Sequence, residues 1–262
     1  MAETEMMEIE LDGGIVRGVL HRPAPDADKP SPAALVCRGV HLPGEDAHKL
    51  LDDLTQGLTA AGFATLLFEH RCADLILEDF DAHCAGDDAR DAQAALAWLK
   101  QQADIDAARI GVIGYSLGAI AATALVGQCG AITSLCLVSA ATAAFVRETL
   151  TRNGSQAITA EHLPAAYAPS LESIDSAKQI AAFDRPALVV HGAADRIIPP
   201  EISGVYVEAL RALGRPVEHV LIARGGHTFS TAEARASCVE QIVRFHAACL
   251  NANEPAAVAG QA

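Results

Sequence analysis

The chain has 262 residues, of which 51% are hydrophobic, and its formal net charge at pH 7 is −14. This length can bury one sizeable core, so we expect a single domain over residues 1–250, followed by a disordered tail over residues 251–262 that lacks apolar periodicity. The negative charge argues against nucleic acids and membrane surfaces as partners, because both repel an acidic protein.

Targeting signals and cysteine usage favour a cytoplasmic protein. The residues from Met1 to Glu5 show neither the basic nor the apolar region of a secretory signal. No apolar run reaches the roughly 18 residues that a membrane span needs. The seven cysteines are scattered without metal-type CxxC spacing, which is typical of reduced thiols.

The predicted elements begin with a hairpin and then alternate between strands and helices. Residues 8–22 predict two strands that turn at Asp12-Gly13-Gly14, and the Pro-rich residues 23–32 predict an exposed connection. Strands are then expected at 33–37, 63–68, 110–114, 135–138, 187–190 and 217–223, and helices at 46–61, 87–102, 119–126, 201–213 and 231–250. This order predicts an α/β fold with a mostly parallel sheet covered on both faces, in which ligands bind at the carboxyl ends of the strands.

The segment over residues 140–184 interrupts this alternation. It is longer than the single helix that an α/β unit needs, so it predicts a small helical cap over the site. We expect its Phe145 and Tyr167 to contact the substrate, together with His41 and Tyr115. Its acidic residues, which solvated helix faces explain most simply, are Glu148, Glu161, Glu172 and Asp175.

A candidate nucleophile lies in the segment Gly114-Tyr115-Ser116-Leu117-Gly118, between a buried strand and an apolar helix. A nucleophile elbow needs this strand, turn and helix context. Glycines two positions before and after Ser116 prevent collisions in the sharp turn, while the hydroxyl projects outward. The pattern therefore predicts a nucleophilic serine.

A serine nucleophile needs a histidine base and a carboxylate that orients the histidine. Asp195 follows the strand at 187–190, and His227 follows the strand at 217–223 within a loop that begins with two glycines. Both positions lie where a parallel sheet places ligands. We expect structural roles for the other candidate histidines, which are His191, His219 and His246.

The order Ser116, Asp195, His227 and the motifs around these residues resemble the α/β-hydrolase family across residues 8–250. The resemblance implies an oxyanion hole made of the N–H groups of Leu117 and Val40. Arg38-Gly39-Val40 stands where the family usually has His-Gly-x. Glu69-His70-Arg71-Cys72-Ala73 stands where related hydrolases often have Asp-x-Arg-Gly, which bears on loop shape more than on chemistry.

These residues predict hydrolysis of a small carboxylic ester through an acyl-enzyme, without a cofactor. A serine aminopeptidase and a thioesterase would use the same mechanism, and a non-catalytic binding protein could use the same fold. An aminopeptidase would need an acid for the substrate's ammonium group, which the segment at 140–184 could supply. The sequence leaves the oligomeric state open.

A second group of histidines and aspartates could be mistaken for a metal site. It has neither an HExxH motif nor close spacing on one element, so we interpret it as solvated loop residues and expect no metal. We expect Asp87, Asp88 and Asp91 to favour a helix N-terminus instead. The members of the group are His41, His48, His70, Asp74, Asp79, Asp81 and His83.

Overall fold

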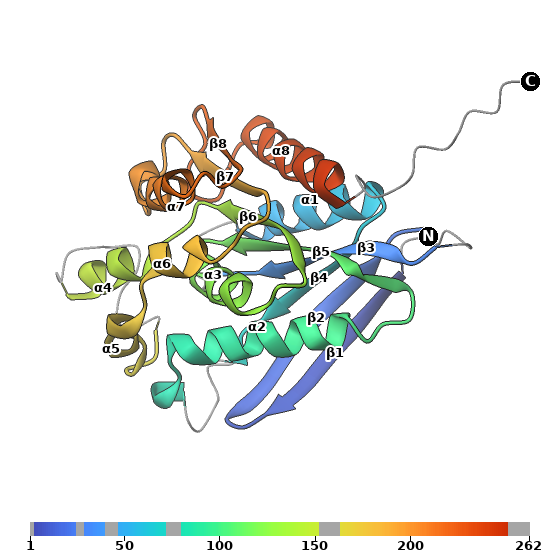
Figure 1. The fold of residues 1–262 in the computed structure, drawn as a ribbon, viewed down its shortest axis with the longest axis horizontal. Helices are drawn as coiled ribbons and strands as arrows, with labels where there is room; N and C mark the ends of the chain where they lie inside the picture. Colours follow the sequence, from blue (N-terminus) through green and yellow to red (C-terminus); the bar gives the residue numbers. More distant parts are fainter. Residues whose placement is uncertain (1–2, 25–28, 40–46, 72–79, 152–162, 251–262) are drawn as a thin grey trace, which may run out of the picture.

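The computed structural model describes residues 3–24, 29–39, 47–71, 80–151 and 163–250 (Figure 1). Within these ranges, eight strands form one sheet in the order β1-β2-β4-β3-β5-β6-β7-β8. The first three strands in this order are antiparallel, and all later neighbours are parallel. The strands are β1 (Glu3–Leu11), β2 (Gly14–Arg22), β3 (Ser31–Cys37), β4 (Ala64–Glu69), β5 (Ile105–Tyr115), β6 (Ile132–Val138), β7 (Ala187–Gly192) and β8 (Val217–Ile222).

Helices cover both faces of the sheet, as the alternating pattern predicts (Figure 1). The apolar residues of α1 and α8 pack on one face, and those of α2, α3 and α7 pack on the other. This two-sided burial explains why β3, β6, β7 and the second half of β5, from Ile110 onward, are mostly apolar. The helices are α1 (Ala47–Ala60), α2 (Ala85–Leu99), α3 (Gly118–Gln128), α4 (Ala143–Thr151), α5 (Tyr167–Ser170), α6 (Ser176–Ala181), α7 (Pro200–Ala212) and α8 (Ala232–Leu250), with short 3-10 helices η2 (Phe80–Ala82) and η4 (Leu171–Ser173).

The structure confirms the predicted hairpin and the order of strands and helices, and it moves several boundaries. β1 begins at Glu3 rather than near Glu8, because an edge strand needs few buried side chains and Met7 alone is fully buried there. Gly13 and Gly14 have φ values of 88° and 141°, which accounts for the glycine pair at the turn. β5 also begins five residues earlier than the apolar run that predicts it.

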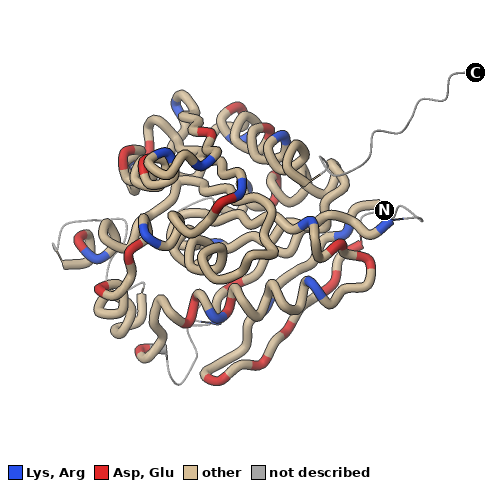
Figure 2. The backbone as a smooth tube through the Cα atoms, viewed as in Figure 1, with Lys and Arg blue, Asp and Glu red and all other residues tan. Residues whose placement is uncertain are grey.

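The long connection between β6 and β7 is helical in its described parts. It contains α4, α5, η4 and α6, and the first three of these form a separate apolar cluster with Leu117 and Ile120 beside the candidate elbow. Residues 152–162 and the predicted tail at 251–262 lie outside the described ranges. The described helices include none that is long and apolar enough to cross a membrane. Lys, Arg, Asp and Glu are distributed along most elements of the fold (Figure 2).

The last helix carries a completely buried histidine. His246 of α8 lies with Nδ1 2.8 Å from Ser134 Oγ of β6, and a Cβ on Gly111 of β5 would approach the same nitrogen to 2.6 Å. Glycine in β5 therefore makes room for the imidazole. Burial lowers the pKa of His246 from 6.5 to about 3, so the folded protein keeps this ring neutral at moderately acidic pH.

We predict that His246 makes folding sensitive to acid. Below pH 6.5 the unfolded chain takes up a proton that the folded chain excludes until about pH 3. The stability of the wild type relative to His246→Leu should therefore fall by about 1.4 kcal/mol for each pH unit in this interval. Urea unfolding of both proteins across the interval checks this, and stability curves that stay parallel would contradict it.

Candidate active site

The site begins with a strained turn at Ser116, between β5 and α3. Ser116 has a φ of 56°, and its backbone N–H donates to the Val138 carbonyl of β6 at 2.9 Å. A Cβ on Gly118 would collide with the carbonyl oxygens of Cys37 and Arg38. Only glycine therefore allows α3 to start so close to the end of β3, and the sharp turn that the sequence predicts is present.

Three loops at the carboxyl ends of β5, β7 and β8 bring Ser116, Asp195 and His227 together. His227 Nε2 lies 3.0 Å from Ser116 Oγ, and His227 Nδ1 lies 2.8 Å from Asp195 Oδ2. All three residues are at least nine-tenths buried. The three side chains thus form a continuous hydrogen-bonded chain that could carry a proton away from the serine hydroxyl.

The backbone of His227 is anchored to neighbouring strands. Its carbonyl oxygen accepts hydrogen bonds from Ser139 Oγ at 3.2 Å and from the Tyr115 hydroxyl at 3.4 Å. The ring of Tyr115 also packs beside the imidazole, with 5.6 Å between ring centroids. Tyr115, which the sequence analysis expects to contact the substrate, is buried and supports the histidine in this arrangement. Sequence reasoning missed Ser139, which follows β6 without a motif of its own.

Asp195 lies in a buried pocket of hydrogen-bond donors. Its Oδ1 accepts from the backbone N–H groups of Ile197 at 2.9 Å and Ile198 at 3.0 Å. Its Oδ2 faces both His227 and His191. Burial by itself would raise the pKa of Asp195, but the hydrogen bonds from these histidines hold it well below its ordinary range. The carboxylate is therefore charged at neutral pH and can stabilise an imidazolium.

One of the two expected oxyanion donors lies among the described residues. The N–H of Leu117 points from the start of α3 and has no hydrogen-bond acceptor among the residues that the structure describes. Val40 and His41 lie outside the described residues. Gly39 is described, and a Cβ there would lie 2.9 Å from Ser116 Cβ and 3.1 Å from Leu117 N. Glycine at this position thus lets the chain after β3 approach the nucleophile, a requirement that sequence reasoning missed.

The two expected substrate contacts in the long connection have different environments. Phe145 of α4 is partly buried against the apolar cluster that includes Leu117 and Ile120. Tyr167 of α5 is 2% exposed, and its hydroxyl donates to Asp88 Oδ2 of α2 at 2.7 Å. Tyr167 therefore connects α5 to α2 through a buried hydrogen bond.

A buried polar cluster lies between the end of β4 and the start of α2. His70 and Asp91 are 9% and 0% exposed in their side chains, and His83 Nε2 lies 2.7 Å from Asp88 Oδ1. Asp87, in contrast, accepts from the Cys84 N–H at 2.8 Å and caps α2, as predicted. The interpretation of His70 and His83 as solvated loop residues is wrong, because both are buried beside the carboxylates of α2. Asp74 and Asp79 of the same predicted group lie outside the described residues, His48 is exposed on α1, and Asp81 is exposed in η2.

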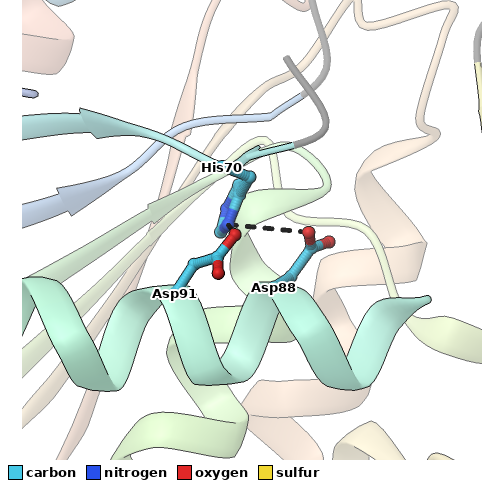
Figure 3. Close-up of side chains that lie close together, drawn as sticks. All are labelled: His70, Asp88 and Asp91. Carbon is cyan, nitrogen blue, oxygen red and sulfur yellow. Dashed lines mark ion pairs between the residues drawn. The ribbon is translucent and has the colours of Figure 1, made fainter. Parts of the chain in front are cut away.

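His70 faces two carboxylates in this cluster (Figure 3). Its Nδ1 lies 3.5 Å from Asp88 Oδ1 and 3.7 Å from Asp91 Oδ2, and neither ring nitrogen has a hydrogen-bond partner among the described residues. Arg71 neutralises Asp91, to which its backbone N–H donates at 2.9 Å and its Nε at 2.7 Å. One imidazole and two carboxylates within 4.8 Å of one another could hold a metal ion. A proton on His70 would also supply a positive charge next to the two carboxylates. Burial by itself lowers the pKa of His70, but Asp88 and Asp91 outweigh this effect and raise it.

The chain is similar to known proteins in sequence and in fold. A model of the prolyl oligopeptidase family matches residues 55–253. An uncharacterized protein of Mycobacterium tuberculosis is 29% identical over 208 residues, which cover 75% of this chain and 63% of that protein. The chain thus spans less than two thirds of the length of this curated relative.

Solved structures share the fold at low sequence identity. Est1E from Butyrivibrio proteoclasticus is 18% identical with a TM-score of 0.75, over 93% of this chain and 99% of that chain. A puromycin-hydrolyzing peptidase of Mycobacterium tuberculosis is 19% identical with a TM-score of 0.75, over 97% and 40%. The acylaminoacyl peptidase of Pyrococcus horikoshii is 13% identical with a TM-score of 0.74, over 97% and 42%.

We predict that the proton on His70 stabilises the fold in acid. Because its folded pKa is raised above 6.5, the stabilisation is complete below pH 6.5 and is lost as the pH rises through the folded value. The wild type should therefore lose stability relative to His70→Phe as the pH rises above 6.5. Urea unfolding of both proteins at these pH values checks the sign. If added Zn²⁺ stabilised the wild type and not His70→Phe, a metal ion would occupy the cluster instead.

Proposed function

Because the chain belongs to the prolyl oligopeptidase family, we propose that Ser116, His227 and Asp195 are a catalytic triad that cleaves small carboxylic esters. The family and the fold make the protein an α/β-hydrolase that acts on ester or peptide bonds. The observation that carries the proposal is the chain of contacts at 3.0 Å and 2.8 Å through the His227 ring.

The proposed reaction has two halves, each with one proton transfer through His227. In the first, Ser116 Oγ attacks the carbonyl carbon while Nε2 takes the hydroxyl proton. The same nitrogen then gives this proton to the leaving alcohol, which leaves an acyl-serine. In the second half, Nε2 takes a proton from water, the hydroxide attacks the acyl-serine, and the returned proton restores Ser116.

The remaining parts of the site support the charged states in this sequence. Asp195 faces Nδ1 and stabilises the imidazolium that forms in each half. Leu117 N–H is our candidate for one oxyanion donor, and Val40 N–H is our candidate for the other. The close approach of Gly39 to Ser116 supports a donor from this loop. Loss of one such donor typically costs about a hundredfold or more in turnover.

The acids of the long connection favour an ester over an aminopeptide substrate. Asp175 accepts from the Lys178 N–H at 3.0 Å and caps α6. Glu148 and Glu172 lie on exposed helix faces, and Glu161 lies outside the described residues. None of the three described acids is buried, so none is positioned to hold an ammonium group in a water-poor pocket. Activity towards esters, thioesters and amides distinguishes the substrate classes, and labelling of Ser116 distinguishes an enzyme from a non-catalytic binding protein.

We predict that Ser116→Ala lowers ester turnover by about 10³-fold or more, because triad residues act as a unit and only oxyanion and binding contributions remain. His227→Ala should cause a comparable loss. A panel of chromogenic esters, thioesters and aminoacyl amides measures the effect and ranks the bond types. His219→Ala is the matched control, since His219 of β8 lies in the strand rather than at the site, and it should retain activity.

Different outcomes separate the alternatives. Retained turnover in Ser116→Ala would remove this residue from the mechanism. Preferred cleavage of aminoacyl amides would assign an aminopeptidase. If the wild type cleaved other bonds as well as it cleaves esters, the triad assignment would stand, but the assignment of esters as the substrate class would fail. If a fluorophosphonate failed to label Ser116 in the wild type, the binding role would be favoured.

We also propose that the connection over residues 140–184 is a cap that selects the substrate. Its apolar residues Ala143 and Val146 pack in one cluster with Leu117, directly after the nucleophile. The Ala141 N–H donates to the Ser116 carbonyl at 3.1 Å, so the start of this connection contacts the elbow itself. Side chains on α4 are thus close enough to line an acyl or alcohol pocket.

We predict that Ala144→Leu changes the ratio of kcat/KM between short and long esters by about tenfold, because one added side chain in a pocket is worth 1–3 kcal/mol. Ala144 is exposed on α4, so the melting temperature should change little. Ala212→Leu adds the same side chain at an exposed position at the far end of α7 and is the control. An unchanged ester-length profile in Ala144→Leu would place substrate selection outside the cap.

A further inference from the structure

A second histidine, which the sequence analysis treats as structural, contacts the candidate catalytic acid. His191 of β7 is completely buried, and its Nε2 lies 3.0 Å from Asp195 Oδ2. This is the carboxylate oxygen that also faces His227 Nδ1 at 2.8 Å. Two imidazole rings therefore share one oxygen of the same buried carboxylate.

The neighbours of His191 fix the position of its proton. Nε2 faces two acceptors, since the Ile198 carbonyl oxygen lies 2.9 Å away in addition to Asp195 Oδ2. The nitrogen must carry the hydrogen, because an unprotonated Nε2 would face two acceptor oxygens at contact distance with no hydrogen between them. Nδ1 lies 2.8 Å from the hydroxyl of Ser203 on α7, which holds the ring in plane. The hydrogen on Nε2 therefore lies between Asp195 Oδ2 and the Ile198 carbonyl oxygen, and both accept from it.

This hydrogen bond acts on the carboxylate in two ways. It fixes the rotation of the carboxyl group, because Oδ1 is held by the N–H groups of Ile197 and Ile198 while Oδ2 is held by the two rings. It also offsets part of the negative charge that would otherwise act on the His227 ring. A buried carboxylate with two rings on one oxygen is therefore a weaker partner for imidazolium than a carboxylate with one.

We propose that His191 is a positioning residue that acts through Asp195 and sets the pH range in which His227 is an active base. The inference rests on the proposed function, since it assigns His191 to the triad of that reaction. The competing interpretation is purely structural: His191 ties the end of β7 to the loop at Ile198 and to α7 at Ser203, and so contributes only to stability.

The experiment measures how fast a fluorophosphonate labels Ser116 as a function of pH, which makes the readout independent of the natural substrate. We compare the wild type with His191→Leu, which removes the donor, and with His191→Gln, whose side-chain amide can reach the Nε2 position and donate in its place. His246→Gln replaces another completely buried histidine, which lies between α8 and the sheet, and is the control.

We expect His191→Leu to move the acid limb of the labelling profile to higher pH. With one donor lost, the Asp195 charge acts more strongly on His227, so the protonated and inactive ring persists to higher pH. Labelling near neutral pH should slow by about tenfold, the equivalent of one hydrogen bond to a charged group. His191→Gln should restore most of the wild-type profile, and His246→Gln should match the wild type.

The outcomes separate this inference from the proposed function. If wild-type Ser116 did not label, the proposed function would fail. If Ser116 labelled and His191→Leu lowered only the melting temperature, with the acid limb unchanged, His191 would be structural and the inference would fail. Should His191→Leu not fold, Ser203→Ala provides the second test: it removes the Nδ1 partner and should move the limb in the same direction by a smaller amount, and an unmoved limb would overturn the inference.

Discussion

The close contact between the start of α3 and the end of β3 is the constraint on which the site depends. The backbone around Gly118 lies against the Cys37 and Arg38 carbonyls, so no side chain fits there. This contact pushes Ser116 into a left-handed conformation at the carboxyl edge of the sheet, where its N–H is held by the Val138 carbonyl of β6. The local strain is offset by the two-sided burial of the central strands, because a packed sheet does not yield to relieve one turn.

The loops after β7 and β8 then fit around the fixed serine. A Cβ on Gly192 would collide with the Gly225 carbonyl, so these two loops meet through their backbones beside the sheet. Their contact places Asp195 and His227 within 2.8 Å of each other, although 32 positions separate them in the sequence. Gly118, Gly192 and Gly225 lie near the carboxyl ends of β5, β7 and β8. Each allows one backbone to approach another close to a polar side chain of the site.

The fold and the candidate triad could be predicted from the sequence because both follow local rules. Buried strands are apolar runs, and Ser116, Asp195 and His227 each follow such a run with glycine nearby. The buried polar cluster could not be predicted in this way. His83 and Asp88 are ordinary polar residues in a loop and a first helical turn, and Asp88 has partners as distant in the sequence as His70 and Tyr167. The contacts of His191 could not be predicted for a similar reason, since it lies at the next-to-last position of an apolar strand and its partners follow in a loop and on α7.

The polar cluster links the long connection between β6 and β7 to α2 and to the end of β4. Asp88 and Asp91 lie three positions apart on α2, and therefore on one helical face that is turned toward the end of β4. Asp91 is bound there by Arg71, while Asp88 accepts from Tyr167 of α5. The long connection between β6 and β7 is thus attached through the buried Asp88 carboxylate at α5 and through the Ala141 N–H, which donates to the Ser116 carbonyl, at its start. Replacing Asp88 would remove the acceptor of the Tyr167 hydroxyl and loosen α5, which packs in one apolar cluster with α4 and with Leu117 beside Ser116.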